Sequence, residues 1–341
     1  MKLAKTYNFI GFILLTVIIL ILPRSISAEN KKFSVCVGIS NYKNKPLRSS
    51  VNDANEICQR LRTDFDFAKA ETLTNEEATR KNILDKIIFY QNKVSKGELF
   101  VFYYSGHGTV FPDKLSDEVD ETTETKIILS RDGKLLVKQR YDSALIPFDS
   151  TSDSDGKRWK NLILDDELFE LFEKFTRKGA KVIFISDSCH SGNLAKGGLM
   201  LNAKYPFKFM STEEALGIKD LSEIEKQKEE EIRKKGVLER QIPDRNFSES
   251  YLMIASSQVN QLSSSGNPET GEEMSLFTYY FLKTLDGHKK NKLKSTYKTI
   301  LETVAPKVKE FGDSIDSPQT PNFDDRFFKK EYLNTPIFSF D

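Results

Sequence analysis

Two segments of this chain end in side chains that could perform nucleophilic catalysis. Cys189 lies just after an apolar run at residues 181–185, and His107 follows a second apolar run at residues 99–104. Each pattern predicts a buried strand whose end lies at the carboxyl edge of a parallel sheet. If the two strands are neighbours, this edge brings together a thiol and an imidazole, the pair that performs covalent acyl transfer.

The residue types around the pair predict a role for each group. Cys189 would be the nucleophile, because a helix expected just after it and a nearby imidazole would both favour the thiolate over a thiol with a pKa near ~8.5. His107 would protonate the leaving amine and then activate water. The backbone N–H groups of Cys189 and Gly108 would form an oxyanion hole.

The other histidines and other chemistries fit less well. His190 is predicted to face away from the site and support the turn, and His288 lies in a lysine-rich segment where we expect it to be solvated. One Cys and one His at the ends of two strands supply too few ligands for a tetrahedral metal site. A tyrosine phosphatase is excluded because residues 190–196, directly after Cys189, contain no Arg to hold a phosphate.

The elements that must position these residues alternate between strands and helices. Residues 33–39 predict a buried strand, and apolar positions at residues 51–61 predict a helix capped by Ser49 or Ser50. A capping box at residues 74–77 predicts a second helix running through Ile83 and Ile88. This rhythm is typical of a parallel sheet with helices on both faces, a three-layer α/β/α sandwich.

The rest of the chain adds two insertions to this pattern. Residues 109–143 are polar and acidic, with a hairpin expected at residues 127–137 around Asp132-Gly133. Residues 193–250 form a long insertion whose charged part, residues 220–240, predicts a solvated surface helix. A helix opening at Asp165, a strand at residues 251–255, helices at residues 274–285 and 295–311, and an extended tail at residues 317–321 complete the prediction.

Charge and cysteine content narrow the class of protein. The chain has 341 residues and a formal net charge of +1, which implies no broad affinity for nucleic acids. Of its three cysteines, Cys36 and Cys58 occupy apolar positions and are expected to be small buried hydrophobic residues. Cys189 is the one with a reason to remain a free thiol.

The N-terminus has the pattern of an export signal. Lys2 and Lys5 precede an apolar run from Phe9 to Leu22, and small residues lead up to Ala28. This pattern predicts a signal peptide at residues 1–28, cleavage after Ala28, and an exported protein that is periplasmic or secreted. The alternative is an uncleaved segment that anchors the protein in the membrane. Residues 29–341 are expected to form a single domain in either case.

The two catalytic segments together resemble a known family. Residues 104–108 (Tyr-Ser-Gly-His-Gly) and 187–192 (Asp-Ser-Cys-His-Ser-Gly) are similar to the two catalytic motifs of caspase-like peptidases, specifically metacaspases. Residues 37–54, 144–168 and 255–280 resemble further parts of that family, so that the resemblance spans most of residues 32–325. It implies the caspase–hemoglobinase fold, with a mostly parallel sheet of about six strands.

The resemblance also implies an activity. Metacaspases are cysteine endopeptidases with a Cys–His dyad, here Cys189 and His107, that cleave after Arg or Lys. Their acidic S1 pocket matches Asp53 and Asp187, and two carboxylates suit a guanidinium or an ammonium group. The alternative roles are helix capping for Asp53 and hydrogen bonding within a turn for Asp187.

Calcium activates many metacaspases, and Asp165 and Asp166 match two of the acidic positions involved. Oxygen ligands suit this cation, although both residues could instead complement a helix N-terminus. The chain departs from the family pattern, with Lys196 near the place where an Asp is expected and with the hairpin interrupting the acidic loop that holds Asp120 and Asp142. We therefore expect no required cofactor, with Ca²⁺ as a candidate activator.

The sequence leaves rival functions and one regulatory prediction. A non-proteolytic caspase-like binding or signalling domain is the first alternative, and a legumain- or clostripain-like peptidase of other specificity is the second. Expected partners are peptide or protein substrates, with no nucleic acid, and a membrane only if the N-terminal segment stays uncleaved. Basic residues in the second insertion predict self-cleavage near Lys235 or Arg240, against the alternative of an intact surface helix.

Overall fold

The structure is a computed structural model that describes most of the chain from Lys31 onward as one compact unit. The described residues are 31–43, 45–112, 126–129, 135–139, 141–152, 159–189, 205–210, 249–258, 261–315, 317–324 and 328–339. Within these ranges, no helix is both long enough and apolar enough to cross a membrane. The predicted signal peptide, the helix expected after Cys189 and the charged stretch at residues 220–240 lie outside them and stay predictions.

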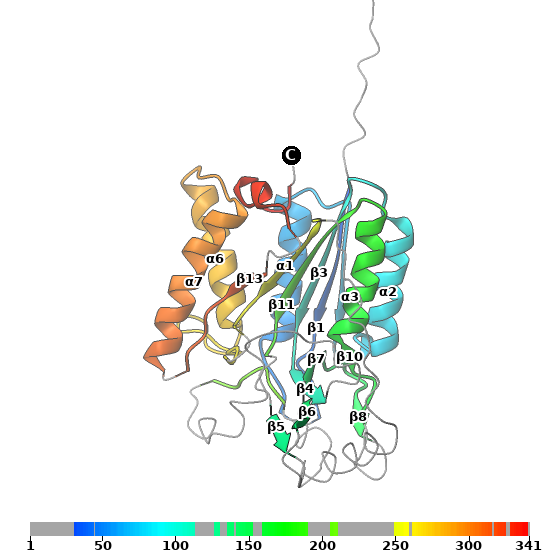
Figure 1. Ribbon diagram of the computed structural model, residues 1–341. Helices are drawn as coiled ribbons and strands as arrows, with labels where there is room; N and C mark the ends of the chain where they lie inside the picture. Colours follow the sequence, from blue (N-terminus) through cyan, green and yellow to red (C-terminus); the bar gives the residue numbers. More distant parts are fainter. Residues whose placement is uncertain are drawn as a thin grey trace, which may run out of the picture. The chain divides into compact units, whose positions relative to one another are not determined.

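A six-stranded sheet forms the centre of the unit (Figure 1). Its order is β13-β12-β11-β3-β1-β2, and every pairing is parallel except that of β13 with β12. The strands are β1 (Lys32–Gly38), β2 (Lys69–Thr74), β3 (Leu99–Ser105), β11 (Lys181–Asp187), β12 (Tyr251–Ala255) and β13 (Asn322–Asp324). The predicted mostly parallel sheet is confirmed.

Helices cover both faces of the sheet, as Figure 1 shows. Side chains of a strand point alternately to its two faces, and β3 follows this rule. Phe100 and Phe102 pack in a cluster with α2 (Arg80–Lys93) and α3 (Asp165–Arg177). Val101 and Tyr103 pack in a second cluster with α1 (Ser50–Asp64), α6 (Leu276–Lys290) and α7 (Tyr297–Ser314). These two cores confirm the three-layer α/β/α sandwich.

Smaller elements lie beyond the carboxyl edge of the main sheet. β4 (Gly108–Pro112), β7 (Tyr141–Leu145) and β10 (Ile163–Leu164) form an antiparallel sheet that begins at the residue after His107. The predicted hairpin is present as β5 (Lys126–Leu129) and β6 (Leu135–Gln139). β8 (Thr151–Ser152) pairs with β9 (Trp159–Lys160), and single 3₁₀ turns occur at η1 (Asn75–Glu77) and η4 (Lys330–Asn334).

Two local predictions were wrong. The second helix begins at Arg80 with Thr79 as its capping residue, rather than at the expected capping box. Asn75 has a φ of 42°, and its side chain accepts the N–H groups of Ser40 and Asn41, so the chain turns there instead of continuing as a helix. His288 is buried rather than solvated, with Nδ1 3.1 Å from Ser295 Oγ.

Candidate active site

The register of the central strands brings the two predicted catalytic residues to one edge. Ser105 at the end of β3 pairs with Asp187 at the end of β11. His107 and Cys189 each lie two residues beyond that pair, and both are fully buried. The neighbouring strands required by the sequence argument are therefore present.

Two tyrosines and the backbone carbonyl group of Lys45 hold His107 in place. The backbone N–H of His107 donates to Tyr42 Oη (3.0 Å), and Tyr104 Oη donates to the His107 carbonyl (2.8 Å). The Tyr42 and imidazole rings are 4.6 Å apart. Nε2 lies 2.7 Å from the carbonyl oxygen of Lys45. Because a carbonyl only accepts, Nε2 carries a hydrogen, which leaves Nδ1 to exchange a proton during a reaction.

Gly106 is required by this arrangement. A Cβ atom at this position would lie 2.6 Å from Tyr42 Oη and 2.8 Å from Tyr104 Oη. Such distances are below any real carbon contact, so a side chain would displace both hydroxyl groups. The glycine between β3 and His107 therefore allows the backbone to approach the tyrosines that fix the histidine.

The Cys189 thiol is more enclosed than the sequence indicated. Its Sγ accepts the backbone N–H of Ser263 at 2.6 Å, and the side chain packs with Phe209 and Leu262. Burial raises the pKa of Cys189 to about 12, against the opposing effect of the Ser263 N–H and of the Lys208 charge. The group is therefore a neutral thiol in this state, and not the thiolate expected from the sequence.

The two backbone N–H groups expected to form an oxyanion hole converge on one oxygen atom. Gly108 N lies 3.0 Å and Cys189 N lies 3.2 Å from the carbonyl oxygen of Lys208. This is the number and kind of donors that stabilise the oxyanion of a tetrahedral intermediate. The predicted pair is thus assembled, and a peptide carbonyl of the chain itself is bound to it.

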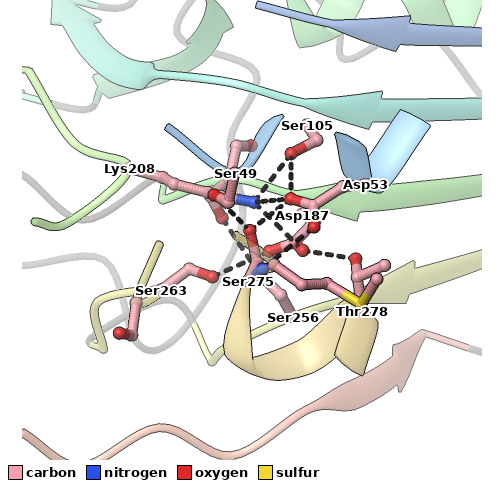
Figure 2. A network of polar contacts seen from close by, with 12 residues as sticks. Ser49, Asp53, Ser105, Asp187, Lys208, Ser256, Ser263, Ser275 and Thr278 are labelled. Carbon is pink, nitrogen blue, oxygen red and sulfur yellow. Dashed lines mark hydrogen bonds and ion pairs between the residues drawn. The ribbon is translucent and has the colours of Figure 1, made fainter. Parts of the chain in front are cut away.

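The side chain of the same lysine fills the predicted acidic pocket (Figure 2). Lys208 Nζ lies 3.2 Å from Asp53 Oδ2, 3.0 Å from Asp187 Oδ2 and 2.8 Å from Ser105 Oγ. All of these side chains are fully buried. The three N–H donors of the ammonium group therefore meet three oxygen acceptors.

Hydroxyl and amide groups hold the two carboxylates. Asp53 accepts hydrogen bonds from Ser105 Oγ (2.8 Å), from Ser275 N (2.9 Å) and from Ser275 Oγ. Asp187 accepts from Ser263 Oγ (2.9 Å) and from Thr278 Oγ1 (2.7 Å). These partners lie far away in the sequence, so the described contacts favour neither helix capping by Asp53 nor a local turn at Asp187.

Burial raises the pKa of Asp53, and the nearby Asp187 charge raises it further. The Lys208 ammonium group and the Ser275 hydrogen bonds act in the opposite direction. A pocket that buries two carboxylates is costly without a cation, because burial penalises every unpaired charge. The Lys208 ammonium group supplies that cation here.

The sequence argument missed the residues that complete the site. No role was predicted for Lys208, Ser263, Ser275, Thr278 and Gln319, although residues 255–280 resemble the family, and all of them except Lys208 follow the second insertion. One feature of the sequence could have indicated Lys208. It lies in a short apolar run with Phe207, Phe209 and Met210, inside an otherwise polar insertion. The basic residues singled out instead, Lys235 and Arg240, lie outside the described residues, as does His190.

The two aspartates matched to calcium-binding positions lie at the start of α3. Asp165 and Asp166 occupy the first turn of α3, and Asp165 Oδ1 accepts the N–H of Asp166 at 3.0 Å. Among the described residues, no group of three or more acidic, His or Cys side chains could hold a metal ion. Asp120 lies outside those residues. A role of Ca²⁺ as an activator therefore stays a prediction.

Comparison with known proteins extends the resemblance. Metacaspase-1 of Schizosaccharomyces pombe is 27% identical over 176 residues, which cover 49% of this chain and 35% of that protein. Metacaspase-5 of Trypanosoma cruzi is 30% identical over 173 residues, which cover 48% of this chain and 33% of that protein. The match thus spans about a third of the length of these relatives.

The fold and the family follow from two further matches. Protein GSU0716 of Geobacter sulfurreducens has a TM-score of 0.59 at 22% identity, covering 91% of this chain and 98% of that chain, and so shares the fold. The family profile of the caspase domain, peptidase C14, matches residues 31–332. With a profile that covers most of its length, the chain belongs to the caspase domain family of cysteine peptidases.

Proposed function

We propose that this protein is a cysteine endopeptidase that uses Cys189 and His107 to cleave peptide bonds after Lys or Arg. One observation carries the proposal. A lysine of the chain itself has its ammonium group between Asp53 and Asp187 while its carbonyl oxygen accepts hydrogen bonds from Gly108 N and Cys189 N. A substrate residue preceding a cleaved bond needs both contacts at once.

The chemistry follows from the groups at the sheet edge. His107 takes the thiol proton as Sγ of Cys189 attacks the substrate carbonyl, and the two N–H groups hold the oxyanion. His107 then protonates the leaving amine, and a water molecule attacks the thioester while His107 removes its proton. The Lys45 carbonyl on Nε2 fixes the ring through this exchange.

This mechanism needs no metal or organic cofactor, since the thiol, the imidazole and two N–H groups supply every step. We propose that activity persists when calcium is chelated. Export to the periplasm or medium also stays a prediction, because residues 1–28 lie outside the described part of the chain.

Covalent probes test the proposed specificity. Peptidyl acyloxymethylketones with Lys or Arg as the last residue should modify Cys189, and the matched Asp probe should react far more slowly because two carboxylates repel it. Peptide mass mapping identifies the labelled residue, and parallel reactions with a calcium chelator test metal dependence. An Asp or Asn probe that labels Cys189 faster would favour the legumain-like alternative. No labelling by any probe, together with no hydrolysis of any peptide, would favour the non-proteolytic domain.

Gln319 is expected to position the strand that binds substrate. Its side chain is buried, Oε1 accepts the N–H of Ser264 (2.9 Å), and Nε2 donates to the Ser256 carbonyl (2.9 Å). Ser263, the residue directly before Ser264, contacts Cys189, Asp187 and Lys208. Gln319→Ala should leave two buried backbone groups unpaired, a loss of about 1–3 kcal/mol each.

The expected result is a roughly tenfold or greater loss of kcat/KM toward basic peptides, with a change in KM that a purely destabilising substitution would not give. Gln319→Glu keeps the acceptor for Ser264 N–H but sets a buried carboxylate oxygen against the Ser256 carbonyl, so it should not restore the activity. Gln258→Ala is a matched control on an exposed position of the same region. Unchanged KM in Gln319→Ala, measured below its unfolding temperature, would show that the residue does not position the site.

A further inference from the structure

The loop between α6 and α7 carries a basic surface that the proposed chemistry does not use. Residues 289–294 read Lys-Lys-Asn-Lys-Leu-Lys, and all of them are exposed. α6 begins directly after Ser275, which binds Asp53 in the acidic pocket, and its 15 residues extend over about 22 Å. The loop therefore lies at the opposite edge of the sheet from Cys189, where β1 begins, as Figure 1 shows.

The hydrogen bonds of this turn hold an apolar side chain out in solvent. Leu293 N donates to the His288 carbonyl (2.8 Å), and Lys292 N donates to the Lys289 carbonyl (3.3 Å). This is the Schellman ending of a helix, in which a glycine usually takes the left-handed position that Lys292 occupies here with a φ of 54°. The next residue often packs back onto its helix, yet Leu293 is 58% exposed. Neither residue favours stability at its position, and together they indicate a contact made by this turn.

Three of the four lysines in this loop have no acidic partner among the described residues. Lys289 is the exception, with Nζ 2.9 Å from Asp64 Oδ1. A lysine in the last turn of a helix stabilises the helix dipole, which accounts for Lys289 and Lys290 because α6 ends at Lys290. Lys292 and Lys294 lie beyond the helix, so the fold gives no reason for their charge.

Further lysines surround the loop at the same edge of the sheet, because they lie at or just before the first residues of β1, β2, β3 and β11. They are Lys31, Lys32, Lys69, Lys96, Lys178 and Lys181. We call residues 289–294 and these lysines the basic face. Acidic residues are fewer at this edge, and Asp64 and Asp286 are both bound by Arg60. The positive charge is local, because the whole chain has a net charge of only +1.

We propose that the basic face, with Leu293 at its tip, binds the surface of a membrane that contains anionic phospholipids. A lysine held near such a surface strengthens binding about fivefold. An exposed leucine can enter the boundary between headgroups and acyl chains while the lysines around it stay at the headgroups. A leucine among lysines favours a membrane over a nucleic acid, which offers no apolar layer. The proposal goes beyond the peptidase activity and uses none of its residues.

The point at which the chain enters the compact unit agrees with this contact. The unit begins at Lys31, on the basic face, and residues 23–30 separate it from the apolar run at residues 9–22. A linker of this length reaches at most about 28 Å when extended. An N-terminal segment that stayed in a membrane would therefore keep the basic face close to that membrane.

Vesicle sedimentation of a chain that begins at Glu29 tests the contact. Residues from Lys31 onward form a compact unit with both hydrophobic cores, and this chain lacks the apolar run that would itself insert. It should sediment with vesicles of equal parts phosphatidylglycerol and phosphatidylcholine at low salt, and not with phosphatidylcholine alone. Binding should weaken strongly near ~0.5 M salt, because screening shortens the reach of the lysine charges.

Two triple variants locate the surface. Changing the three unpaired lysines of residues 289–294 to Gln should weaken binding to the anionic vesicles roughly a hundredfold. The matched control changes Lys81, Lys160 and Lys309 to Gln, which removes the same charge from exposed positions away from the basic face and should have a far smaller effect. Thermal unfolding should be similar in both variants, because all the substituted side chains are exposed.

Fluorescence tests the apolar contact separately. The chain has a single tryptophan, Trp159, so Trp159→Phe combined with Leu293→Trp leaves one reporter, at the tip of the loop. Its emission should shift to shorter wavelengths when anionic vesicles are added. Leu293→Asn keeps every charge and should bind about tenfold more weakly, because it loses the burial of an apolar side chain.

The inference is wrong if the protein does not sediment with anionic vesicles at low salt, or if the two triple variants lose binding equally. A reporter whose emission does not shift would show that the loop tip stays in water and would overturn the membrane contact. Equal binding to a single-stranded RNA would assign the basic face to nucleic acids and would overturn it too. Vesicle binding by protein that hydrolyses no peptide would still support it, so the membrane contact and the proposed function can fail separately.

Discussion

Cys189→Ala should abolish hydrolysis of basic peptides while leaving the protein folded. Removing the nucleophile deletes the covalent route, and losses for catalytic units of this kind reach roughly 10⁴-fold or more in kcat. Only one sulfur atom is removed from the buried cluster with Phe209 and Leu262, so the free energy of unfolding should change by less than ~2 kcal/mol. Thermal unfolding and peptide turnover measure the two effects on the same sample.

His107→Ala should be nearly as damaging, and the double variant should be little worse than either single one, because the two groups act as a unit. Cys58→Ala is the matched control, since it removes a buried thiol from α1 and should keep its activity. Turnover by purified Cys189→Ala protein would refute the mechanism.

Much of the fold could be predicted because each strand carried its own signal. The runs at residues 99–104 and 181–185 are apolar throughout, as strands covered on both faces must be, and they are the neighbouring β3 and β11. The start of α2 was harder to predict from the sequence. Its capping pattern at residues 74–77 was sound locally, but Asn75 binds the backbone of Ser40 and Asn41 across the sheet edge, a contact between distant segments that no local pattern reveals.

The site also contains residues that the sequence predicts and residues that it does not. His107, Cys189 and Gly108 lie at strand ends, so the sheet topology alone places them together. Asp53 and Asp187 needed the family resemblance, because nothing in their spacing links a helix residue to a strand end 134 positions later. Ser275, Thr278 and Gln319 could not be predicted. They act by hydrogen bonds to a site built from other segments, and serines, threonines and glutamines occur throughout the chain.

The Cys189 thiol shows a further limit of sequence reasoning. Proximity to an imidazole and to a helix predicts a lowered pKa, yet burial raises the pKa of this thiol to about 12. The difference comes from burial, and the buried cluster around Cys189 is formed by Phe209 and Leu262. Both residues come from segments distant in the sequence, so a local motif cannot report their effect on the thiol.

Asp53→Asn should remove most of the preference for basic residues. Breaking a buried charge pair costs about 3–5 kcal/mol, which corresponds to a loss of roughly 100-fold to several thousand-fold in kcat/KM for a lysine peptide. A peptide with leucine in the same position gains no ion pair and should change little. The ratio of the two rates is the measurement, because it does not depend on the fraction of active enzyme.

Asp85→Asn on the exposed face of α2 is the control and should leave this ratio unchanged.

The same pocket predicts an effect of pH on KM. Burial raises the pKa of Asp53 above its ordinary value, so acidification should protonate Asp53 sooner than an exposed aspartate, which titrates near ~3.9. Protonation removes a charge that holds the substrate ammonium group, and KM for lysine peptides should therefore rise as the pH falls. Asp53→Asn lacks this carboxylate, so the rise in KM should be smaller in that variant. An unchanged lysine-to-leucine ratio in Asp53→Asn would show that the pocket does not set specificity.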